Sequence, residues 1–119
     1  MQIQANGIAI QYELAGPETA PVLMLSHCLA GSMHIWDSQF KTFAEKYRVL
    51  RYDLRGHGGS SPPDQNYTME MLAGDAAALL EALEIQSVHF MGISLGGMLG
   101  QTLALKHPEK VSSLILCDT

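Results

Sequence analysis

The segment Gly92-Ile93-Ser94-Leu95-Gly96 constrains the fold more than any other part of the chain. It joins an apolar run of strand length, 88–91, to a stretch with a helical pattern, 95–107, that stops before Pro108. A strand that passes directly into a helix needs a sharp turn, whose central residue has a strained backbone and an exposed side chain. Gly92 and Gly96 remove the side chains that would clash in such a turn. The sequence therefore predicts that Ser94 lies at the tip of a strand–turn–helix unit.

Short apolar runs and helical patterns alternate along the rest of the chain. Asn6-Gly7 between Ile3–Ala5 and Ile8–Leu14 predicts a β-hairpin. We expect strands at 22–25, 49–52, 88–91 and 111–117, helices at 36–46, 69–83 (with Thr68 as N-cap) and 95–107, and a loop at 55–67. This alternation predicts the α/β class, a three-layer αβα arrangement with a mostly parallel sheet. Ligands of such sheets bind beyond the carboxyl ends of the strands.

Composition excludes several classes of function. Hydrophobic residues make up 47% of the 119 residues, which is enough for the core of a single domain. The net charge is −5 and no basic cluster occurs, so neither nucleic acid nor an anionic membrane surface is expected as a partner. The sequence shows neither a secretory signal nor a membrane span, and we expect a cytoplasmic protein without metal or cofactor. Cys28 and Cys117 are expected to be reduced, buried thiols.

The predicted turn gives Ser94 a chemical role. The helix that starts at Leu95 directs free N–H groups and a positive dipole end to this point, which favours an oxyanion and hence acyl transfer. Two N–H donors are needed to hold that oxyanion. We assign one to Leu95 and the other to Leu29, in the loop Ser26–Ser32 after the strand at 22–25. The spacing of the glycines does not fit a nucleotide-binding loop.

Three blocks of sequence together resemble the α/β-hydrolase superfamily, and most closely its 3-oxoadipate enol-lactonases and related small esterases. These blocks are His27-Cys28-Leu29 with Met33–Asp37, then Arg51–Ser60, then Gly92–Gly97. The family often has glycine where this chain has Cys28. The resemblance implies hydrolysis of small esters or lactones through a Ser94 acyl-enzyme. It also implies that residues 1–119 are the N-terminal portion of one α/β-hydrolase domain, without its lid and C-terminal part.

In this family the nucleophile is followed along the chain by an acid and then by a histidine. The catalytic His and Asp are therefore expected from sequence outside this chain, and the segment alone is expected to be inactive. A complementary C-terminal chain is a candidate partner, besides a small ester or lactone substrate. Asp118 is a candidate acid, whereas Asp53 and His57 are expected to shape a turn rather than to act in catalysis.

Other functions remain open at this point. The same fold carries cofactor-free haloperoxidase-like and carbon–carbon bond hydrolase activities, and fold alone does not separate them from esterases. A ligand-binding module that keeps the Ser94 turn, and a non-catalytic fragment that assembles with a complementary chain, are the alternatives outside enzymology.

Overall fold

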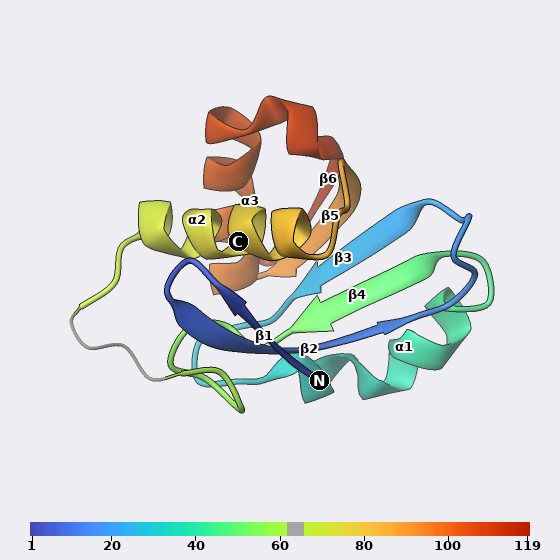
Figure 1. Ribbon diagram of the computed structural model, residues 1–119, viewed down its shortest axis with the longest axis horizontal. Helices are drawn as coiled ribbons and strands as arrows, with labels where there is room; N and C mark the ends of the chain where they lie inside the picture. The colour runs from blue at the N-terminus through green and yellow to red at the C-terminus, as the bar shows by residue number, and fades with distance from the viewer. Residues whose placement is uncertain (62–65) are drawn as a thin grey trace.

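A computed structural model describes residues 1–61 and 66–119, and these residues form a six-stranded sheet (Figure 1). The strands are β1 (Gln2–Ala5), β2 (Ile8–Ala15), β3 (Val22–Ser26), β4 (Arg48–Tyr52), β5 (Val88–Ile93) and β6 (Val111–Cys117). Their order in the sheet is β1-β2-β4-β3-β5-β6. The pairs β4·β3, β3·β5 and β5·β6 are parallel, and the two N-terminal strands are antiparallel to their neighbours. The expected mostly parallel sheet is confirmed.

The opening hairpin forms because its turn residues tolerate a left-handed backbone. Asn6 and Gly7 have φ values of 51° and 79°, as a two-residue type I′ turn requires. The turn fixes the register, with Ala5 opposite Ile8. The hairpin adds two antiparallel strands to the edge of the parallel sheet.

Helices cover both faces of the sheet (Figure 1). They are the 3₁₀ turn η1 (Met33–Trp36), α1 (Asp37–Phe43), α2 (Met69–Ala82), α3 (Leu95–Lys106) and a second 3₁₀ turn, η2 (Pro108–Lys110). The helices α2 and α3 lie on one face and α1 lies on the other. The expected three-layer arrangement is confirmed.

Two apolar clusters follow from the alternation of side chains along the strands. Met24, Leu50 and Phe90 point to the face under α2 and α3, and each is fully buried. Leu23, Leu25 and Val49 point to the opposite face, where they pack with Trp36 beside α1. The larger cluster lies under α2 and α3, so the sheet is held mainly from that side.

The first helical region differs from its expected form. The pattern predicted one helix over 36–46, but the structure has a 3₁₀ turn at 33–36, followed by an α-helix that ends at Phe43. The 3₁₀ turn starts earlier because the Ser32 hydroxyl accepts the His34 N–H and the Asp53 carboxylate accepts the Met33 N–H. Tertiary contacts thus set this boundary, which helical periodicity does not reveal.

The other boundaries agree closely with expectation. The Thr68 hydroxyl accepts the Met71 N–H at 3.1 Å, which confirms the N-cap of α2. The expected loop at 55–67 contains no helix or strand among its described residues, and 62–65 of it lie outside them. Cys28 and Cys117 are free thiols, but both are half-exposed, so the expectation of burial was wrong. Over the part of the chain that the structure describes, no helix is long and apolar enough to cross a membrane.

Candidate active site

Ser94 occupies the strained turn that the sequence predicts. Its φ and ψ are 52° and −116°, a conformation that costs a non-glycine residue of order 1–3 kcal/mol. The Ser94 N–H donates to the Cys117 carbonyl at 2.9 Å, and the Ser94 carbonyl accepts from the Met98 N–H at 3.0 Å. These backbone bonds tie the residue to β6 and to α3, while its side chain is exposed. The turn therefore presents the hydroxyl to solvent at the N-terminus of α3.

The two glycines of the motif are required by close backbone approaches. A Cβ at Gly92 would overlap the backbone of Gly96 and Gly97. A Cβ at Gly96 would lie 2.7 Å from the His27 carbonyl oxygen and would also overlap the Ser26 carbonyl. The first approach keeps the turn tight. The second brings the loop after β3 against the start of α3.

That loop lies beside Ser94 because β3 and β5 are paired. Ser26, the last residue of β3, is the register partner of Gly92. Among the described residues, neither the Leu29 N–H nor the Leu95 N–H donates to any protein group. Leu29 is 62% exposed and Leu95 is buried. The structure thus places the two expected donors on adjacent segments at the carboxyl end of the sheet.

His27 anchors this loop from inside the molecule. Its ring is fully buried, its Nδ1 lies 2.7 Å from the Cys28 carbonyl oxygen, and its Nε2 accepts the Leu54 N–H at 3.0 Å. Burial, reinforced by the nearby His57, holds the pKa of His27 below its usual value of 6.5, against the opposing effects of the Cys28 carbonyl and Asp53. The imidazole is therefore neutral at pH 7.

Asp53 joins two loops at the same end of the sheet. It is buried, and its two carboxylate oxygens accept the N–H groups of Met33 at 2.7 Å and Gly59 at 2.8 Å. Gly58 has a φ of 50°, and a Cβ there would overlap this carboxylate. The expectation that Asp53 shapes the turn after β4 agrees with these contacts.

Two buried charges were missed by sequence reasoning. Asp75 on α2 is 2% exposed, accepts from the Nε and Nη2 of Arg55 at 2.9 and 2.8 Å, and accepts from the Asn6 amide nitrogen at 2.8 Å. Arg51 on β4 binds Glu13 and Asp37 and stacks on Phe40. The only sequence signal for either is a charged residue inside an otherwise apolar pattern. Both networks hold loops and helices against the sheet.

No described side chain hydrogen-bonds to the Ser94 hydroxyl. His89 binds Ser113 at the amino end of β5, and His107 lies beyond the far end of α3. His34 faces Asp37, the Nδ1 of His57 faces the Arg55 carbonyl, and both ring nitrogens of His27 are engaged. Asp118 is exposed with a φ of 49°. Over the described residues, no group of three His, Cys, Asp or Glu side chains could hold a metal ion.

Comparison with known proteins agrees with this geometry. Residues 21–119 match the family described as the alpha/beta hydrolase fold. The chain is 38% identical to 3-oxoadipate enol-lactonase 2 of Acinetobacter baylyi over 98% of its own length and 44% of that protein. It is 31% identical to human epoxide hydrolase 4 over 99% of its length and 33% of that protein. The crystal structure of the enol-lactonase from Burkholderia xenovorans LB400 superposes with a TM-score of 0.90 at 36% identity, over 93% of this chain and 44% of that one.

A strained serine lies between two tight glycine contacts at the carboxyl end of a mostly parallel sheet. This arrangement is typical of one class of α/β proteins, and the family match identifies that class. The chain belongs to the α/β-hydrolase fold family. It spans less than half the length of the relatives it matches.

Proposed function

We propose that this chain carries the nucleophile and the oxyanion site of a serine hydrolase of small esters or lactones. The observation that carries the proposal is the conformation of Ser94, whose backbone is strained at φ 52° and whose side chain is exposed at the start of α3. A residue that served only to pack the fold would not require this strain. Ser94 is the nucleophile, Leu29 and Leu95 supply the oxyanion donors, and Gly92 and Gly96 permit the turn.

The reaction proceeds in two balanced halves. The Ser94 Oγ bonds to the carbonyl carbon as a base removes its proton, and the carbonyl oxygen becomes an oxyanion that accepts the two N–H groups. The bond from this carbon to the ester oxygen then breaks, and the leaving oxygen takes the proton from the base. Water attacks the acyl-enzyme, its proton passes to the base and then to Ser94, and the acid is released. In a lactone the leaving oxygen stays within the same molecule.

The choice of substrate class rests on the relatives. One sequence relative is named a 3-oxoadipate enol-lactonase, and one structural neighbour is an enol-lactonase. A third relative is named an epoxide hydrolase. A serine nucleophile with two oxyanion donors suits a carbonyl substrate, because attack on a carbonyl creates the oxyanion that the donors bind. Esters and lactones are therefore favoured over epoxides.

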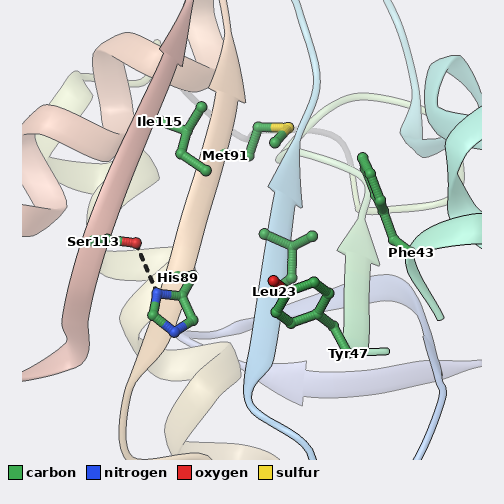
Figure 2. A pocket seen from close by; sticks show the side chains of 7 residues that line it. All are labelled: Leu23, Phe43, Tyr47, His89, Met91, Ser113 and Ile115. Carbon is green, nitrogen blue, oxygen red and sulfur yellow. Dashed lines mark hydrogen bonds between the residues drawn. The ribbon is translucent and has the colours of Figure 1, made fainter. Parts of the chain in front are cut away.

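The base and the orienting acid are proposed to come from sequence outside residues 1–119, in a complementary C-terminal segment. A groove on the face of the sheet that carries α1 suits such a segment (Figure 2). Beside α1 lies a groove of about 300 Å³, with apolar walls that include Leu23, Met91 and Ile115. The residues that line it include a polar pair, His89 and Ser113, whose Nδ1 and Oγ are 2.7 Å apart. Burial of this surface would stabilise the segment that covers it.

The strand β6 supports the same proposal. It is the last strand in the order of the described sheet, and Ile115 and Leu116 are 40% and 43% exposed. An apolar edge strand is a site for pairing with another strand. A segment that pairs with this edge and then continues over the face that carries α1 would also cover the groove. On this proposal, residues 1–119 are the N-terminal portion of one domain and are inactive when they are alone.

The test is active-site labelling. The chain alone and the complete protein are treated with a fluorophosphonate probe, and every polypeptide is then analysed by intact mass. We expect a single adduct on Ser94 in the complete protein and none on the chain alone. Ser94→Ala abolishes the adduct, whereas Ser38→Ala on the exposed surface of α1 keeps it. Turnover of p-nitrophenyl acetate and of small lactones is then measured.

The outcomes separate the competing functions. Labelling together with lactone or ester turnover supports the hydrolase. Labelling without such turnover directs the substrate search to the haloperoxidase-like and carbon–carbon hydrolase chemistries. A complete protein that neither reacts at Ser94 nor hydrolyses esters would contradict the proposal and favour a binding or assembly role.

A further inference from the structure

We propose that His27 is a positioning residue for the oxyanion site: its imidazole fixes the peptide group between Cys28 and Leu29 and thereby directs the Leu29 N–H. This inference rests on the proposed function, since it concerns the donor that Leu29 supplies. His27 itself is buried and does not contact substrate. It acts through the backbone of the loop after β3.

The hydrogen bonds define the tautomer of His27. The Leu54 N–H lies 3.0 Å from Nε2, and a backbone N–H can only donate, so Nε2 is the acceptor and carries no proton. The proton of the neutral ring therefore lies on Nδ1, 2.7 Å from the Cys28 carbonyl oxygen. His27 is fixed as an Nδ1–H donor to that carbonyl.

The Cys28 carbonyl and the Leu29 N–H belong to one peptide group. That group is planar and trans, so its C=O and N–H point in opposite directions. A bond that holds the carbonyl on the protein side therefore turns the N–H away from it. The Gly31 N–H donates to the same oxygen at 3.1 Å. Since the Leu29 N–H has no partner among the described residues, its direction is set by these two bonds on the other side of the peptide.

The surroundings show why this anchor matters. The loop residues Leu29 and Ala30 are exposed, and Ala30 has a left-handed φ of 61°. The Leu29 side chain packs little against the protein, so it does not restrain the loop. The His27 ring lies between the Cys28 carbonyl and the Leu54 N–H and links the loop after β3 to the loop after β4. The ring of His57 lies 5.2 Å away, between centroids, and packs against it.

Two substitutions separate the two hydrogen bonds of the ring. His27→Asn places an amide nitrogen near the position of Nδ1, so the bond to the Cys28 carbonyl is kept and the acceptor for Leu54 is lost. His27→Gln places an amide oxygen near the position of Nε2, so the Leu54 bond is kept and the donor to Cys28 is lost. The two variants are matched in polarity and differ in which bond survives.

The complete, active protein is assayed with a short-chain ester. For His27→Gln we expect kcat to fall about 10- to 100-fold with little change in KM, because an oxyanion donor acts in the transition state. For His27→Asn we expect kcat within about threefold of the unsubstituted protein, although its Tm falls because a buried N–H loses its partner. A positioning role thus separates kcat from Tm, whereas a purely structural role would move both together.

Failure of this inference differs from failure of the proposed function. If the unsubstituted protein is not labelled at Ser94, the proposed function fails. If it is labelled and His27→Gln retains full kcat, or if His27→Asn loses as much kcat as His27→Gln, the role of His27 is wrong. Should both variants fail to fold, the tautomer decides the question in the unsubstituted protein. Long-range ¹H–¹⁵N NMR should show the His27 proton on Nδ1, and a proton on Nε2 would overturn the proposal.

Discussion

Gly96→Ala tests whether the approach between α3 and the loop after β3 is as tight as the structure shows. The new Cβ would lie 2.7 Å from the His27 carbonyl oxygen, and ordinary contact begins at about 3.4 Å, so relief of this contact alone requires one of the two segments to move by at least about 0.7 Å. The Ser26 carbonyl is closer still, and both obstacles are backbone atoms that cannot rotate away. Such overpacking costs about 1–3 kcal/mol of unfolding free energy.

The same displacement would separate the two proposed oxyanion donors, the N–H groups of Leu29 and Leu95. A misplacement near 1 Å reduces catalysis about 100-fold, so we expect a loss of this order in the rate at which Ser94 of the complete protein is labelled. Stability is measured by urea unfolding followed by circular dichroism, with equal m-values required. The matched control is Gly74→Ala in α2, whose Cβ would meet only the Asn6 amide at 3.5 Å, so the higher helix propensity of alanine should stabilise by about 0.5–1 kcal/mol. A Gly96→Ala protein as stable and as reactive as the unsubstituted one would refute the reasoning.

Two further predictions concern the buried groups behind the site. Asp53→Asn replaces one acceptor oxygen by an NH₂ group that faces a backbone N–H. We expect the free energy of unfolding, measured in urea, to fall by about 1–3 kcal/mol, and an unchanged midpoint would contradict this prediction. The pKa of His27 is lower in the folded protein than in the unfolded chain, so the unfolded chain binds a proton at a higher pH than the folded protein does. The free energy of unfolding should therefore fall as the pH is lowered through 6.5. Unfolding midpoints from pH 8 to 5 test this, and His27→Gln should reduce the slope.

Local signals in the sequence predicted the parts of the fold that local chemistry decides. The Asn6-Gly7 turn requires a left-handed backbone at both residues, and few other dipeptides accept it, so the hairpin was predictable. The Ser94 turn was predictable for a similar reason, since Gly92 is required by a contact with Gly96, only four residues away. The contacts that require Gly96 itself are with Ser26 and His27, and these are not local in the sequence. Thr68 caps its helix through a bond to a residue only three positions away.

Features that depend on distant partners were not predictable. The early start of η1 depends on Asp53, which lies 20 residues from Met33. The placement of β4 between β2 and β3 was not predicted, because strand order is set by packing across the whole sheet. Cys28 and Cys117 were expected to be buried from their residue type, but one lies in the loop beside Ser94 and the other at the end of an edge strand. The anchoring contacts of His27 involve Leu54, and no periodicity or motif in the sequence indicates that pairing.

The strand order explains why the proposed nucleophile and both proposed donors occur within these 119 residues. The strand β3 has β4 on one side and β5 on the other, so the connections that leave β3 and β5 go to opposite faces, through α1 and α3 respectively (Figure 1). In sheets of this kind ligands bind beyond the carboxyl ends of two neighbouring strands whose connections diverge in this way. Leu29 follows β3 and Ser94 follows β5, so both residues flank that position in the sheet. On the proposed function, the groups that attack and hold the carbonyl come from this part of the sheet, while substrate choice depends on the residues that cover it.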